Sequence, residues 1–106
     1  LEEGWYSSAV SRAYYALFQA ARTALAHAGI DRPWWRHGTL QATFSTELVR
    51  HRKLYPSSFV HDLNDAVELR HLADYSDSQI PQRRARKVVR AAAEFVSRIR
   101  EVTANA

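Results

Sequence analysis

The residues best suited to chemistry lie close together in the stretch 68–77, which reads Glu-Leu-Arg-His-Leu-Ala-Asp-Tyr-Ser-Asp. Arg70 and Asp74 are four positions apart, so in a helix they share one face and can pair with each other or approach the same ligand. Tyr75 follows at the expected helix end and adds a phenol that can donate a hydrogen bond. An arginine, an acid and a phenol together favour phosphate or nucleotide binding, and a salt-bridged helix end is the alternative.

An apolar stripe leads directly to Arg70. On the expected third helix, successive rows of the stripe contain Phe59, Leu63, Ala66 and Val67, and the next positions are Arg70 and Asp74. An isolated buried charge is too unfavourable to persist. Arg70 must therefore be paired or face a cleft, which is the main reason to place the candidate site there.

A cluster of positive charge marks the start of the expected last helix, with residues Arg83, Arg84, Arg86, Lys87 and Arg90. Positive charge in a first helical turn is unfavourable by ~0.3–1 kcal/mol per residue. The cluster therefore indicates a surface for phosphate or an acidic partner, with compositional drift as the alternative. His37 lies in the expected loop 30–38, between the first and second helices, and follows Trp34 and Trp35 in the sequence. We expect these tryptophans to plug one end of the bundle, and stacking on a base or seating of a partner is the alternative.

No metal site is predicted. His61 and Asp65 are four positions apart, but the remaining histidines lie on other faces or in other segments. The chain has no cysteine to supply thiolate ligands, and no glycine-rich phosphate loop. We therefore expect neither a metal nor a cofactor.

Four amphipathic helices are expected to position these residues. The first, 6–27, carries a continuous apolar stripe that includes Tyr14, whereas Tyr15 lies off the stripe. Further signals are Gly29 after the first helix, Thr39 as N-cap of the second, and Ser57 or Ser58 as cap of the third. Ile80-Pro81 is expected to start the last helix, because proline is tolerated at the first helical position. Short connections between them predict an all-α fold, an antiparallel up-and-down helical bundle of four to five helices.

The composition limits the class of protein. A chain of 106 residues supports one domain, 1–106, with a single core. No stretch is long and apolar enough for a membrane span, and the acidic start does not resemble a signal peptide. The absence of cysteine fits a cytoplasmic protein. The sequence does not begin with Met, so we expect a natural N-terminus upstream of Leu1. The formal charge of +4 and a pI of about 9.9 favour an acidic partner.

Two signatures resemble those of a known family. The segment 11–18, Ser-Arg-Ala-Tyr-Tyr-Ala-Leu-Phe, resembles the Asn/Ser-Arg-Ala-Tyr-Tyr-Ala-x-Phe signature of small prokaryotic HEPN domains, in the UPF0332-like branch. The resemblance continues with His37-Gly38, with Leu69-Arg70 and with the stretch 73–77. It covers nearly the whole chain.

This resemblance implies a helical bundle that commonly forms a homodimer and is often encoded beside a minimal nucleotidyltransferase as a toxin–antitoxin pair. Many members of the family are metal-independent ribonucleases, with a motif of Arg, four to six residues, and His. Arg70 matches the motif arginine, but Tyr75 stands where the histidine is usual. His71 is adjacent to Arg70 and points about 100° around the helix, so it is not equivalent. Tyrosine, with a pKa near 10, is a poor base at neutral pH.

Three functions remain open from the sequence. In the first, the chain binds nucleotide or RNA: Arg70 contacts phosphate, Asp74 orients Arg70, Tyr75 donates a hydrogen bond or stacks, and His37 and the basic cluster add to the surface. In the second, the chain is a ribonuclease in which Tyr75 or His71 replaces the usual histidine. In the third, the Arg70–Asp74 pair is structural and the chain only dimerises and docks a nucleotidyltransferase.

Overall fold

The computed structural model describes residues 2–75 and 80–104, and the side chains within 6–74 and 80–104. All regular secondary structure in this part of the chain is helical. The elements are α1 (Glu2–His27), α2 (His37–Thr43), the π-helical segment η1 (Phe44–His51), α3 (Ser58–Tyr75) and α4 (Gln82–Ala104). The predicted all-α helical bundle is confirmed.

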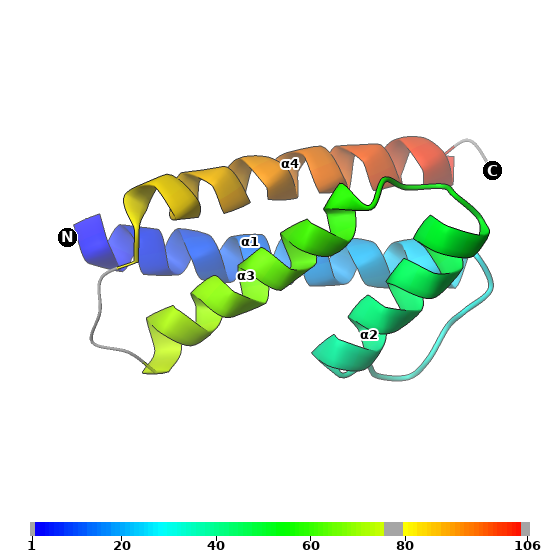
Figure 1. The fold of residues 1–106 in the computed structure, drawn as a ribbon, viewed down its shortest axis with the longest axis horizontal. Coiled ribbons are helices and arrows are strands. Elements are labelled where there is room, and N and C mark those ends of the chain that lie inside the picture. Colours follow the sequence, from blue (N-terminus) through cyan, green and yellow to red (C-terminus); the bar gives the residue numbers. More distant parts are fainter. Residues whose placement is uncertain (1, 76–79, 105–106) are drawn as a thin grey trace.

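The long helix α1 is the centre of the bundle and packs against both α4 and α3. α1 and α4 lie side by side and run in the same direction, whereas α3 crosses in front of α1 in the opposite direction (Figure 1). The connection 28–36 returns from the end of α1 before α2 begins, so α2 and η1 again run in the general direction of α1. This return places the start of α2, and His37 with it, beside the middle of α1.

The core follows the predicted stripes. Leu17 of α1, Leu63 of α3 and Phe95 of α4 are almost completely excluded from solvent. An aromatic stack lies at one end of the core and contains Phe44, Tyr55, Phe59 and Phe95, with neighbouring ring centroids 4.5–5.8 Å apart. The stack joins η1, the following connection, α3 and α4, and therefore fixes how α3 and α4 meet.

Several helix ends differ from the sequence prediction. α1 begins about one turn earlier than residue 6, and α2 begins at His37 with Arg36 as its N-cap, so the prediction of Thr39 as N-cap was wrong. The Thr43 hydroxyl donates to the carbonyl of Thr39 inside the same helix. The spacing of apolar residues does not determine where a helix begins or ends, because a helix can extend past its apolar stripe wherever the backbone hydrogen bonds continue.

The end of α1 is as predicted. Gly29 has φ +87°, a left-handed conformation in which glycine carries no steric penalty. The amide of Ile30 donates to the carbonyl of Leu25 at 2.8 Å, which satisfies one of the last carbonyls of the helix. Ile30 then packs against the core. Among the described helices, none combines the length and the apolar character needed to cross a bilayer.

Candidate functional site

Arg70 of α3 lies against two tyrosine rings of α1. Its guanidinium carbon is 4.6 Å from the ring centroid of Tyr14 and 4.6 Å from that of Tyr15. Its Nη2 also donates a hydrogen bond to the Tyr15 hydroxyl at 2.9 Å. Cation–π contacts of this kind are worth ~0.5–1 kcal/mol at exposed sites, so α1 holds the guanidinium from one side.

Asp74 completes the surroundings of Arg70 on α3. Its Oδ2 lies 3.4 Å from Arg70 Nε, at the predicted four-residue spacing, and the two side chains remain 42% and 30% exposed. Partial burial works to lower the pKa of Arg70, but the hydrogen bond to Tyr15 and the electrostatic attraction of Tyr15, Tyr14 and Asp74 outweigh burial and raise it. Arg70 is therefore a permanent cation that is paired yet still reaches solvent.

His37 approaches the same tyrosines from the start of α2. Its ring centroid is 5.6 Å from that of Tyr14 and 6.4 Å from that of Phe18. Its Nε2 is 3.0 Å from Oε1 of Gln41, and its buried Nδ1 has no partner among the described residues. Burial lowers the pKa of His37, the Gln41 hydrogen bond opposes this effect, and electrostatic repulsion from His71 lowers the pKa further. The imidazole is thus neutral at pH 7.

The two other candidate catalytic residues, His71 and Tyr75, both belong to α3. His71 is exposed on α3 and close enough to His37 to affect its charge. Tyr75 is the last residue of α3, and its side chain lies outside the described residues. The structure therefore brings Arg70, Asp74 and His37 to one place around Tyr14, whereas the role of Tyr75 stays a prediction.

The basic cluster on α4 divides into two parts. Arg84 pairs with two acids of α3, at 3.2 Å to Glu68 and 3.9 Å to Asp65. These acids belong to a different helix, so the positive charge of Arg84 near the start of α4 has a structural partner that helix periodicity alone does not reveal. The remaining cations are exposed on the first turns of α4: Arg83, Arg86, Lys87 and Arg90.

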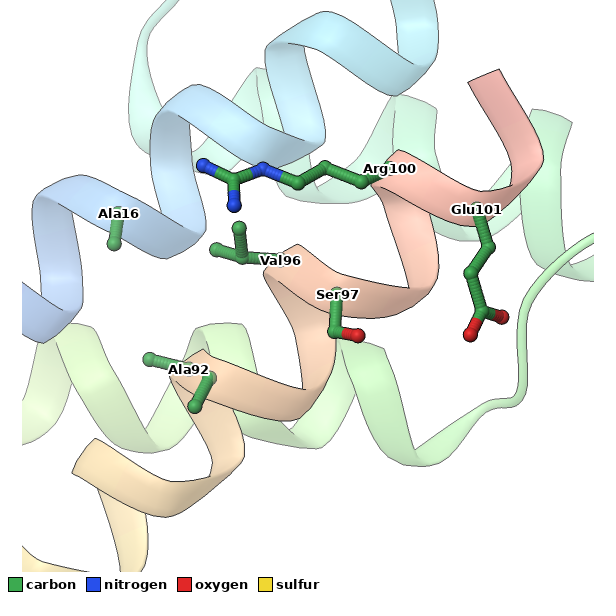
Figure 2. Close-up of a pocket in the computed structure, with 7 residues that line it drawn as sticks. Ala16, Ala92, Val96, Ser97, Arg100 and Glu101 are labelled. Atoms are coloured by element: carbon green, nitrogen blue, oxygen red, sulfur yellow. The ribbon is translucent and has the colours of Figure 1, made fainter. Parts of the chain in front are cut away.

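Neither a metal centre nor a deep cleft stands out in the described part of the chain. No group of three or more potential His, Asp or Glu ligands converges among the described residues. A hollow of about 600 Å³ lies between α1 and α4 (Figure 2). Its walls are mostly small side chains, such as Ala16, Ala92 and Ser97, and Arg100 extends from α4 towards α1 beside it. The acid on its wall, Glu101, pairs with Arg98 at 3.1 Å, so the side chains that line the hollow offer no cluster comparable to the one around Arg70.

Sequence reasoning did not identify Tyr14 and Tyr15 as site residues, although both belong to the signature 11–18. Tyr14 had been assigned to the apolar stripe, and it does pack against the core. Tyr15 lies off the stripe and is 52% exposed. The sequence did contain a signal for these residues, namely an exposed tyrosine next to a tyrosine of the apolar stripe. Adjacent residues of a helix point to different faces, so the two rings extend the aromatic surface beyond the core.

The arrangement is suited to binding a phosphate. Arginine has five N–H donors, and the Nε of Arg70 and one bond of its Nη2 are occupied by Asp74 and Tyr15. The remaining N–H groups stay available for a planar, charge-assisted contact with an oxyanion. The tyrosine rings beside the guanidinium limit its side-chain freedom before a ligand arrives, which reduces the entropy lost on binding.

Comparisons with known proteins give one match. The family model described as "HEPN domain" matches residues 1–102, which is nearly the whole chain. Neither the curated proteins nor the solved structures compared with the chain match it.

Proposed function

We propose that this chain, which belongs to the HEPN domain family, binds RNA or a nucleotide through a phosphate contact at Arg70. Membership of the family is consistent with an RNA-related or nucleotide-binding role. The observation that carries the proposal is the placement of Arg70: it lies over Tyr14 and Tyr15, pairs with Asp74, and keeps 30% of its side chain exposed. A purely structural ion pair does not require two aromatic rings from another helix.

Substitution of Arg70 by Ala, with Arg98→Ala as a matched control, tests this proposal. Both arginines are exposed in part and pair with an acid about one turn later, Arg98 with Glu101 at 3.1 Å. Both substitutions remove one positive charge. Binding of a labelled single-stranded oligonucleotide should weaken for Arg70→Ala at every salt concentration, and the slope of log K against log salt should fall by about 0.7 for one lost phosphate contact.

The control separates a specific contact from net charge. Arg98→Ala should leave the slope at the wild-type value. Equal losses for both variants would indicate non-specific attraction to a basic chain. An unchanged affinity in Arg70→Ala together with lower thermal stability would assign the Arg70–Asp74 pair a structural role.

Metal-independent RNA cleavage is a second candidate, and one observation favours it. His37 contacts the same tyrosine, Tyr14, that Arg70 contacts, so the site contains an imidazole although Tyr75 occupies the usual motif position. A neutral imidazole can accept the proton of a ribose 2′-hydroxyl as that oxygen attacks the adjacent phosphorus, and the P–O bond to the 5′-oxygen breaks while that oxygen takes a proton from water. Because Nδ1 is covered and Nε2 is held by Gln41, the ring must turn to do so. This candidate therefore ranks behind binding.

Cleavage is tested directly by incubating the protein with labelled RNA in EDTA. Wild-type activity that is lost in Arg70→Ala and in His37→Gln would establish His37 as the proton-transfer group. Activity that survives in His37→Gln would return the role to His71 or Tyr75. An absence of products across several RNA sequences would eliminate the ribonuclease candidate.

We further propose that the chain acts as a homodimer and docks a nucleotidyltransferase, in the setting of a toxin–antitoxin pair. The support is the resemblance of the segment 11–18 and of the stretch 69–77 to small prokaryotic family members. Light scattering behind a sizing column tests the dimer, since the mass of one chain is 12.2 kDa. A monomer at all concentrations would contradict this part of the proposal.

A further inference from the structure

Trp34 is the most exposed large apolar side chain in the described part of the chain. It lies in the connection 28–36 between α1 and α2 and is 65% exposed, whereas its neighbour Trp35 is 8% exposed. The expected role as a plug of the bundle therefore fits Trp35 alone. An exposed indole contributes little to the core, so the fold does not explain Trp34.

Arginines flank both indoles. The guanidinium carbon of Arg36 is 5.7 Å from the ring centroid of Trp34, and that of Arg32 is 4.5 Å from the ring centroid of Trp35. These four residues, with Pro33 and Thr39, line a hollow of about 450 Å³. Within it are an aromatic face and two permanent cations, the combination that binds single-stranded nucleic acid by base stacking and phosphate contact.

The buried indole adds a polar signal. Trp35 Nε1 is a donor with no hydrogen-bond partner among the described residues, and Trp35 belongs to the wall of the hollow. Buried donors are nearly always satisfied in native proteins, and leaving one unpaired is unfavourable. Trp35 therefore lines the hollow and also carries a buried donor that no described residue satisfies.

Hydrogen bonds to the main chain hold the connection in place. Arg22 of α1 donates to the Pro33 carbonyl at 3.2 Å, and Arg52, after η1, donates to the Ala28 carbonyl at 3.1 Å. These bonds fix the loop at its start and directly before Trp34, and a loop fixed in this way presents its side chains with less entropy to lose on binding. Trp34 is therefore displayed on a fixed segment.

The hollow is continuous along the chain with the Arg70 site. Arg36 immediately precedes His37, the ring of His37 lies 5.6 Å from that of Tyr14, and Tyr14 also contacts Arg70 at 4.6 Å. The aromatic rings of His37 and Tyr14 thus lie between the cations Arg36 and Arg70 on the way from the loop to α3. This order matches a ligand whose bases and phosphates alternate along one strand.

We infer that Trp34 is a base-stacking position for single-stranded RNA, flanked by phosphate contacts at Arg32 and Arg36, on a strand that continues to Arg70. The inference rests on the proposed function and extends it from one phosphate contact to a path. It names unpaired RNA as the ligand, because a base in a duplex does not expose its face to an indole.

The test compares two labelled probes of about ten nucleotides, a length within the site sizes of single-strand binders. One is oligouridylate, and the other has the same backbone without bases. Trp34→Ala should weaken oligouridylate binding about tenfold, the lower part of the range for one stacked base. It should leave the abasic probe and the salt slope unchanged, whereas Arg36→Ala should lower the slope by about 0.7.

Two further variants make the result specific. Trp34→Phe keeps an aromatic face and should recover most of the affinity. Leu54→Ala removes another exposed apolar side chain, 38% exposed in the connection after η1, and should bind like the wild type. Because Trp34 is exposed, all these proteins should melt at the wild-type temperature.

The outcomes separate this inference from the proposed function. If Trp34→Ala binds oligouridylate like the wild type while Arg70→Ala binds weakly, the inference fails and the Arg70 proposal stands. Equal loss on both probes, or a change in self-association with RNA affinity unaltered, would also overturn base stacking. If the wild type binds neither probe, both the proposed function and the inference fail.

Discussion

The tyrosines of α1, more than Asp74, should hold Arg70 in place, and a double-mutant cycle can measure this. Arg70 and Tyr15 share a hydrogen bond of 2.9 Å and a cation–π contact of 4.6 Å. The first is worth ~0.5–1.5 kcal/mol net and the second ~0.5–1 kcal/mol at an exposed site. Because Tyr15 is 52% exposed, we take the lower half of the summed range, and expect a coupling free energy of about 1–1.5 kcal/mol.

The pair formed by Arg70 and Asp74 provides the internal comparison. Its atoms are 3.4 Å apart with both side chains partly exposed, and exposed pairs at this helical spacing contribute only ~0.3–0.5 kcal/mol. The coupling of Arg70 to Tyr15 should therefore be at least about twice its coupling to Asp74. In high salt the Asp74 coupling should decrease, because solvent-exposed charges are screened, while the Tyr15 coupling should change little.

The assay is urea unfolding of the wild type, Arg70→Ala, Tyr15→Ala, Asp74→Ala and the two double variants, with free energies compared near the transition midpoint. Alanine is well tolerated at these helical positions. Tyr15→Phe, which keeps the ring and removes the hydroxyl, divides the Tyr15 coupling into its two contacts. A Tyr15 coupling below about 0.3 kcal/mol, or one smaller than the Asp74 coupling, would refute this account of how Arg70 is positioned.

Three other predictions concern the backbone and two titratable groups. Gly29→Ala should destabilise the fold by about 1–2 kcal/mol, because Gly29 has φ +87°. Gly38→Ala should stabilise it by about 0.5–1 kcal/mol, because Gly38 lies in a helix and an added Cβ meets no atom within 4 Å. Melting temperatures of the two variants that do not shift in opposite directions would contradict this pair of predictions. Burial lowers the pKa of His37 below 6.5, so as pH falls through 6.5 the unfolded chain takes up the proton first and stability decreases. His37→Gln should flatten that decrease in urea titrations between pH 7.5 and pH 5.5, and an unchanged slope would show that His37 does not cause it. Burial and neighbouring carboxylates raise the pKa of Asp62 above 3.8, so its charged form is disfavoured in the fold and its contribution to stability improves as pH falls through the raised pKa. Asp62→Asn should therefore raise stability at pH 7 by about 0.5 kcal/mol, and a lower melting temperature in that variant would show that the charge is needed.

Much of the fold could be predicted from the sequence because its signals are local. Apolar residues at three- and four-residue spacing define the inward face of a helix whatever it packs against. Gly29 ends α1 because the residue at that position adopts a positive φ, which glycine does without steric penalty. The Arg70–Asp74 pair was equally accessible, since both residues belong to one helix and its periodicity alone sets their separation.

The starts of α2 and α4 could not be fixed to the residue. Arg36 precedes α2 with an extended backbone and makes no side-chain cap hydrogen bond, so nothing in its residue type signals a helix start. Pro81, expected inside the last helix, precedes it, and its carbonyl accepts from the amide of Ala85 at 3.0 Å. The start of a helix can shift by one or two residues, because it depends on which backbone amides and carbonyls pair at the terminus.

The sequence by itself determined that Arg70 is a cation on a helix with an acid one turn later, and that Trp34 and Trp35 lie in a loop. Only the tertiary structure decided that Tyr14 and Tyr15 contact that cation and that His37 lies against Tyr14. It also decided that one tryptophan is buried and the other exposed. Arg70 and Tyr15 are 55 positions apart, and their contact depends on how α3 is rotated against α1. Periodicity fixes which face of each helix is apolar, but the register between two faces is set by how side chains interlock along the core.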